Sequence, residues 1–298
     1  MVFTSFLITF RESLEAALVV SIVAAYLRKV GQIQLWRYLW AGTGLAIGTS
    51  IALGWAVQIV YGGLTGASAQ LFEGVASLTA TGVLSYVVFW MAGNARKIKE
   101  KIERKIEVAI TRGQMFSIAA IAFVAVVREG IETVLFLTAL FFLDPSGTTI
   151  GMMVGITLVG IVSVLLLRGT YNVDVRRFFR YSSVLLIIFA AGLAGYGVHE
   201  LIEAAESYGL ELGVLAQQVY NINPASSANL LHENGAVGSI LKSLVGYDGN
   251  PEWLRVLVYA GYWLTIGTYV FKTYAPESGH FPVKPLSRLP HRTVNWLY

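Results

Sequence analysis

The stretch "TFRESLEAAL", residues 9–18, places one arginine and two glutamates inside the first apolar run of the chain. A second stretch, "VVREGIETVL" at 126–135, repeats the pattern R-E-x-x-E inside another apolar run. Ionisable side chains are costly within a membrane, where they are rare and commonly mark functional sites. The two stretches therefore predict a membrane protein whose function depends on buried charges.

The composition supports this class of protein. The 298 residues are 55% hydrophobic and 13% charged, whereas soluble domains are about 25% charged. The absence of cysteine excludes disulfides, cysteine metal sites and thiol catalysis. The net charge of +4 does not indicate a nucleic-acid partner, because the basic residues lie in short connectors between apolar runs. We expect an all-α integral membrane protein in contact with lipid.

Seven apolar runs reach the length of about 20 residues that a membrane helix needs. The predicted spans are 4–27, 38–61, 71–93, 115–142, 149–168, 181–205 and 254–273. The first basic residue, Arg11, lies within the first run, which argues against a cleaved signal peptide and favours a retained span. Eighteen Lys and Arg residues follow spans one, three, five and seven, and only Lys242 lies on the opposite side. The N-terminus is therefore predicted outside and the C-terminus inside.

The two matching motifs predict an internal repeat. Spans one and four carry the motifs and cross in opposite directions, so we expect an inverted three-plus-three repeat with one additional C-terminal helix. Both motifs then face one central region of a single transport domain. Its predicted parts are repeat 1 (about 1–93), an inner amphipathic linker helix (about 94–114), repeat 2 (about 115–205), an external cap segment (about 206–253), and the last span with an inner tail (about 254–298).

The motif spacing indicates a cation site. At 100° per residue, an arginine, the next residue and a residue four positions on fall within one 100° arc of a helix. The two motifs together sum to a charge of −2, and carboxylate oxygens suit hard cations such as Mg, Mn and iron. The alternative is two intrahelical salt bridges that only hold the helices together. The predicted ligands are Glu12, Glu15, Glu129 and Glu132, with Arg11 and Arg128 as their charge partners.

Further polar residues suggest a path to this site. Glu73 begins a stripe that continues through Ser77, Thr81 and Ser85, which either passes an ion along or packs helices together. In "GVHELIEAAE", His199, Glu200 and Glu203 lie near the outer end of span six. This group either collects metal at the mouth or forms a solvated helix end.

Taken together, these segments resemble the oxidase-dependent iron permease family, which includes the fungal high-affinity iron permease and the bacterial Efe-type permease. The family motif is usually R-E-G-L-E, and this chain has "RESLE" and "REGIE". The resemblance also covers "FEGVASLTATGVLSYVVFWM", "HELIEA" and "GSILKSLVGYDGNP", and so extends over nearly the whole chain. Ser13 replaces the family's glycine, and its side chain could loosen a close helix contact.

The resemblance implies a multi-pass permease, not an enzyme, that imports Fe²⁺ or Fe³⁺ across a plasma membrane or bacterial inner membrane without a prosthetic group. It implies that the motif glutamates handle the iron and that an external ferroxidase or periplasmic iron-delivery protein is a partner. Two alternatives stay open. One is a carrier of another divalent cation such as Mn²⁺, since oxygen ligands do not exclude it. The other is a membrane di-iron oxidase, which is disfavoured because the predicted spans contain no Glu-x-x-His pair and have His199 as their only histidine.

Overall fold

A computed structural model describes residues 1–94, 98–111, 115–167, 175–224, 229, 232 and 235–269, and these residues are almost entirely helical. Two 3₁₀ turns (Ile33–Leu35, Gly213–Ala216), a π-helical turn (Trp263–Gly267) and one isolated bridge between Gln218 and Glu252 complete the regular structure. The α-helices are α1 (Val2–Lys29), α2 (Trp36–Gly62), α3 (Ala67–Asn94), α4 (Ile98–Thr111), α5 (Met115–Leu143), α6 (Pro145–Leu167), α7 (Val175–Ser207), α8 (Ala236–Val245) and α9 (Trp253–Tyr262).

Four helices are long and apolar enough to cross a membrane. They are Ile33–Gly62, Ala67–Trp90, Pro145–Val164 and Tyr181–Ser207, with mean hydropathies of 1.4 to 1.9. They correspond to the predicted spans 38–61, 71–93, 149–168 and 181–205. Helices α1 and α5 are comparable in length to these four, at 28 and 29 residues, but each carries the three charges of its motif near its middle. The count of seven spans stays a prediction, and the end of the last span and the inner tail lie outside the described residues.

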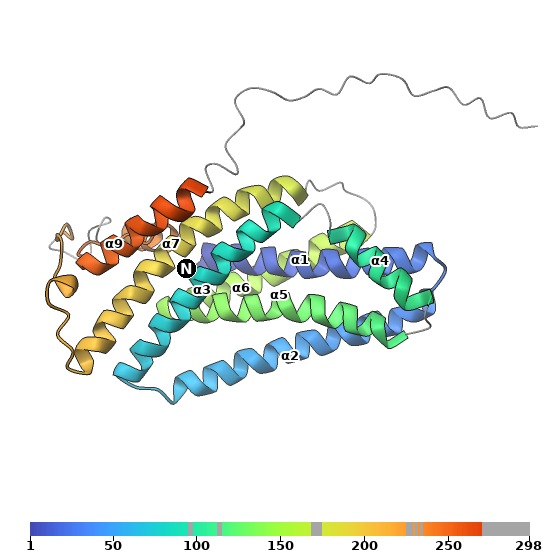
Figure 1. The fold of residues 1–298 in the computed structure, drawn as a ribbon, viewed down its shortest axis with the longest axis horizontal. Helices are drawn as coiled ribbons and strands as arrows, with labels where there is room; N and C mark the ends of the chain where they lie inside the picture. The colour runs from blue at the N-terminus through green and yellow to red at the C-terminus, as the bar shows by residue number, and fades with distance from the viewer. Residues whose placement is uncertain are drawn as a thin grey trace, which may run out of the picture.

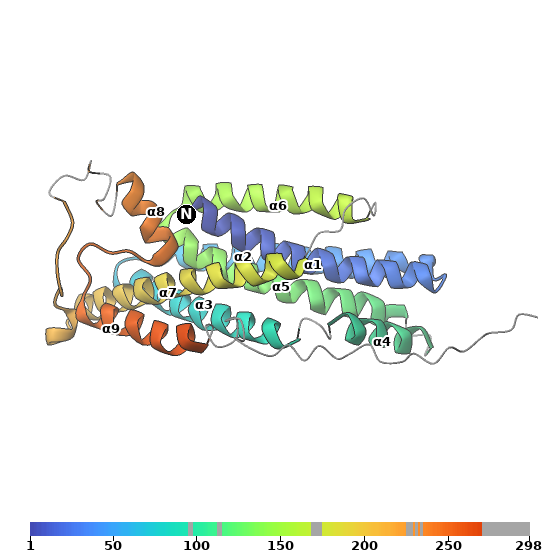
Figure 2. The same ribbon diagram turned by 90° about the horizontal axis from the view of Figure 1, so that it is seen from above.

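The long helices lie side by side in an elongated bundle (Figures 1 and 2). The most extensive contacts join α3 with α7, α1 with α6, and α2 with α5, while α1 also packs against α5. The amine of Met1 lies 3.4 Å from Asp144 Oδ2, so the start of α1 meets the end of α5 and the two helices are antiparallel.

Small residues allow the close helix contacts. A Cβ added to Gly42 of α2 would overlap the backbone of Ala119 on α5. A Cβ on Gly155 of α6 would crowd Thr9 on α1 in the corresponding pair. In the third pair, Gly74 of α3 approaches Gly197 of α7, as small residues commonly do between membrane helices.

Two apolar clusters fill the bundle on either side of the charged motifs. One contains Ile8 and Phe136, which are fully buried, together with Leu84 and Leu186. The other lies toward the opposite end and contains Val23, Leu27, Leu39 and Ile118. The motifs at 11–15 and 128–132 lie between these clusters along α1 and α5, so the charges occupy a level near the middle of the bundle.

The connecting segments gather at the two ends of the bundle. The α2–α3 connection and the segment after α7 lie at one end, and α4 lies at the other (Figure 1). The amphipathic helix predicted in the linker is confirmed as α4, which buries Ile106 and Ala109 against α1 and α5. The segment predicted as an external cap, about 206–253, contains the short helix α8.

Candidate functional site

Arg11 is fully buried between the two glutamates of the first motif. Its Nη1 donates a hydrogen bond of 2.7 Å to Glu12 Oε1, and its Nη2 forms an ion pair of 3.1 Å with Glu15 Oε1. Arg11 and Glu12 have no exposed surface, and Glu15 is 9% exposed. The pairing with Glu15 joins positions four residues apart on α1, as the motif spacing predicts. One guanidinium therefore faces two buried carboxylates.

The second motif has a different arrangement. Arg128 Nε donates to Glu132 Oε1 at 2.9 Å, while Glu129 Oε1 is 3.8 Å away. The guanidinium carbon of Arg128 lies 4.4 Å from the centre of the Trp90 ring on α3. The Arg128 side chain is 38% exposed, in contrast to the enclosed Arg11. Arg128 thus holds Glu132 more closely than Glu129.

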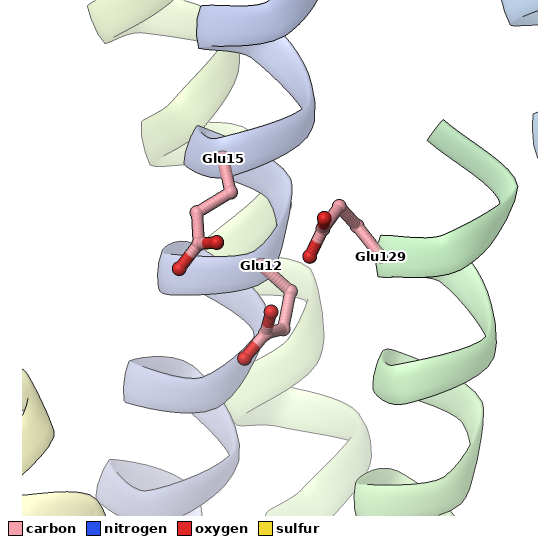
Figure 3. Close-up of side chains that lie close together, drawn as sticks. All are labelled: Glu12, Glu15 and Glu129. Carbon is pink, nitrogen blue, oxygen red and sulfur yellow. The ribbon is translucent and has the colours of Figure 1, made fainter. Parts of the chain in front are cut away.

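Three of the four predicted ligands come together between α1 and α5. Glu12, Glu15 and Glu129 each offer a carboxylate oxygen, and these oxygens lie within 4.8 Å of one another. Figure 3 shows Glu129 extending from α5 toward Glu12 and Glu15 on α1. Glu132 is also buried, at 7% exposed, but it lies with Arg128.

The glutamates of the two motifs have carboxylate oxygens without hydrogen-bond donors among the described residues. Among the residues that the structure describes, Oε2 of Glu12, Glu129 and Glu132 are buried and accept no hydrogen bond. Buried polar atoms normally find a partner, and an unmet buried acceptor destabilises the fold. The four glutamates and two arginines sum to −2, so a bound cation would satisfy both the oxygens and the charge.

The close packing around the second motif includes its glycine. A Cβ added to Gly130 would overlap Ser50 Oγ of α2. The corresponding position of the first motif is Ser13, which is partly exposed. The glycine of the second motif therefore lies at a close approach between α5 and α2.

Glu73 lies away from the cluster and is held by two tyrosines. Its Oε1 accepts a hydrogen bond from Tyr61 Oη and its Oε2 accepts one from Tyr196 Oη, both at 2.6 Å. The polar stripe that follows Glu73 is buried. Thr81 Oγ1 donates to the carbonyl of Ala190 on α7 at 3.3 Å, which favours helix packing as the role of that hydroxyl.

The structure places two carboxylates near His199 that the sequence analysis missed, those of Glu252 and Asp248. His199 Nδ1 lies 2.8 Å from Glu252 Oε1, and His199 Nε2 lies 3.3 Å from Glu203 Oε1. A cavity of about 340 Å³ is lined by His199, Glu200, Glu252 and Asp248, among others. Burial raises the pKa of Glu252, but the hydrogen bonds to its carboxylate and the charges of His199 and Arg255 together leave this pKa below its usual value. No pattern in "GYDGNPE" indicates this contact, since the segment reads only as a turn.

Apolar side chains separate the cavity beside His199 from the glutamate cluster. A smaller cavity of about 20 Å³ lies next to it and is lined by residues that include Thr4, Leu140 and Tyr196. Ile8 and Phe136 are fully buried one turn from Glu12 and Glu132 along their helices. The cluster is therefore closed off by apolar packing on this side.

The family model and the named relatives that match this chain are all iron permeases. Residues 2–272 match the model of the iron permease FTR1 family. An uncharacterized protein of Archaeoglobus fulgidus is 41% identical over 267 residues, which cover 90% of this chain and 94% of that protein. The ferrous iron permease EfeU of Yersinia pestis is 32% identical, with 86% and 89% covered. The protein of the same name in Escherichia coli strain 536 is 30% identical, with 86% and 91% covered. No solved structure matches the chain.

Proposed function

The chain belongs to the iron permease FTR1 family, and we propose that it carries ferrous iron across a membrane through the cluster of Glu12, Glu15 and Glu129. The observation that carries this proposal is the set of buried carboxylate oxygens that lack hydrogen-bond donors among the described residues. Carboxylate oxygens are suitable ligands for a hard or borderline divalent cation. The name of the EfeU relatives, ferrous iron permease, supports iron in its ferrous state as the cargo.

The proposed roles of the six motif residues differ. Glu12, Glu15 and Glu129 ligate the ion, and Glu132 contributes the fourth negative charge from its place beside Arg128. Arg11 and Arg128 limit the repulsion among the carboxylates when no ion is bound. With one Fe²⁺ the charge of the whole group becomes zero, which lowers the cost of holding it in a membrane.

Transport of iron can be tested directly with the purified chain in proteoliposomes. Fe²⁺ kept reduced, Fe³⁺, Mn²⁺ and Zn²⁺ are offered separately, and Fe²⁺ is also offered together with a ferroxidase. We expect Fe²⁺ to accumulate well above empty liposomes and faster than Mn²⁺. Mn²⁺ uptake equal to or faster than that of iron would assign the site to another divalent cation. Uptake that requires the ferroxidase would instead identify the oxidised ion as cargo and support an external oxidising partner.

We also propose the inverted three-plus-three repeat. Exchanging α1 with α5, α2 with α6 and α3 with α7 turns the α1–α6 contact into the α5–α2 contact and returns the α3–α7 contact to itself. This correspondence, together with the antiparallel α1 and α5, supports two related halves that share one site.

The proposed orientation places the N-terminus outside a plasma membrane or bacterial inner membrane. A cysteine at Ser68 should then react with an impermeant thiol reagent from outside.

The cavity beside His199 is the proposed outer point at which ions are collected. His199, Glu200 and Glu252 line it, and Glu203 lies 3.3 Å from His199. Glu73 is linked to the cavity through Tyr196. We expect Glu252→Gln to raise the KM for Fe²⁺ about 5-fold and to leave the maximal rate within about 2-fold, because capture precedes translocation. Initial uptake rates across a range of Fe²⁺ concentrations provide the measurement, with the exposed Glu211→Gln as the matched control. An unchanged KM would indicate that the His199 group is only a solvated helix end and does not collect ions.

A further inference from the structure

We infer that Trp90 is a positioning residue for the iron site, which it serves by holding Arg128 away from Glu129. The inference rests on the proposed function, since it assigns a role to a residue beside the proposed ligands. Trp90 lies on α3, outside both motifs, and its ring stacks on the Arg128 guanidinium at 4.4 Å.

The two motifs provide an internal comparison. Each has an arginine, a glutamate directly after it and a second glutamate four positions on. Arg11 approaches both of its glutamates, at 2.7 and 3.1 Å. Arg128 approaches Glu132 at 2.9 Å but remains 3.8 Å from Glu129. The same local sequence therefore gives two different ion-pair geometries.

The contact with Trp90 accounts for this difference in geometry. A guanidinium is attracted to the face of an aromatic ring, and tryptophan offers the strongest such interaction. Arg128 Nε remains directed at Glu132 while the guanidinium plane lies over the ring. In this position the cation does not close on Glu129.

The position of Arg128 determines which carboxylates are available to an ion. Glu129 Oε2 accepts no hydrogen bond from the described residues, and Glu129 lies within the cluster formed with Glu12 and Glu15. If the guanidinium moved onto Glu129, it would compete with a bound cation for that carboxylate. Trp90 thus keeps Glu129 available to the ion and leaves Glu132 as the partner of Arg128.

The test measures equilibrium binding of Fe²⁺ to the purified, detergent-solubilised protein. We expect Trp90→Leu to raise the Kd about 10-fold, the size of a partly desolvated cation–π contact, with the stoichiometry unchanged. Trp90→Phe retains a weaker ring and should raise the Kd about 3-fold. Tyr86→Leu is the matched control, because Tyr86 is an aromatic residue of the same helix that is 64% exposed, and its Kd should equal that of the wild type.

A double-mutant cycle distinguishes positioning from a general structural effect. In an Arg128→Gln background, Trp90→Leu should change the Kd little further, because the residue it positions is gone. Should Trp90→Leu fail to fold, Trp90→Phe with and without Arg128→Gln gives the same comparison. Wild-type affinity in the Trp90 variants, or an equal loss in both backgrounds, would overturn the inference. A wild-type protein that binds no iron would instead refute the proposed function.

Discussion

Glu129→Gln is expected to lower Fe²⁺ uptake at least about 100-fold, because it removes one of the three proposed carboxylate ligands while keeping the shape of the side chain. Mutation of residues that only hydrogen-bond to metal ligands typically lowers metal affinity or activity about 10- to 100-fold. The loss of a ligand itself should therefore lower uptake by at least as much. The effect should appear in the maximal rate as well as in the KM, since no later step proceeds without the ion. Uptake into proteoliposomes, normalised to inserted protein, measures it.

The shared site also predicts non-additivity. Glu12→Gln should be as severe as Glu129→Gln, and the double variant should be little worse than either one, because residues that act as a unit do not contribute independently. Metal analysis should find one ion bound in the wild type and none in either single variant. Near-normal uptake by a correctly inserted Glu129→Gln protein would rule out the shared site and favour salt bridges that only hold the helices.

Among the variants proposed for this protein, Arg11→Gln is expected to lower the free energy of unfolding the most. The change leaves Glu12 and Glu15 buried without the cation that faces both of them. Removing one partner of a buried ion pair typically costs about 3–5 kcal/mol, because the remaining charge stays buried. We expect little folded protein in the membrane, measured by size-exclusion chromatography of the detergent extract and by the melting temperature of whatever is recovered.

A compensating change separates charge from packing. Arg11→Gln combined with Glu12→Gln removes one charge of each sign and should recover folded protein, although not transport. Arg37→Gln is the control, since Arg37 is exposed beside Tyr38, and surface changes of this kind usually stay within about 0.5 kcal/mol. An Arg11→Gln protein as stable as the wild type would show that the buried ion pairs are not needed for folding.

The sequence predicted the features that depend on order along one helix. Apolar length predicted the four candidate spans, and the amphipathic helix predicted in the linker at about 94–114 corresponds to α4. The motif spacing placed Arg11 and Glu15 on one face of α1, and both motifs do meet at one level of the bundle. The family resemblance is confirmed by the match over residues 2–272.

The pattern of the sequence did not predict which residues of different helices are in contact. The motifs look equivalent, so nothing local indicates that Glu129 joins the first motif's glutamates while Glu132 remains with Arg128. The difference comes from Trp90, a residue of a third helix that is 38 positions away along the chain. Glu252 likewise reaches His199 only because the segment after α8 returns to α7. Periodicity describes the face of a helix, but it carries no information about which residue of another helix lies opposite that face.

The contact between Gly130 and Ser50 determines how this chain would tolerate variation. A screen of all substitutions, scored by growth on scarce iron, would find position 130 among the most intolerant in the chain, beside the glutamates. The cause would be steric, since glycine has no side chain to offer an ion. Position 13 should accept several small residues in the same screen, because the chain already carries serine there. Positions 13 and 130 would thus be under different constraints, although they occupy the same place in the two motifs.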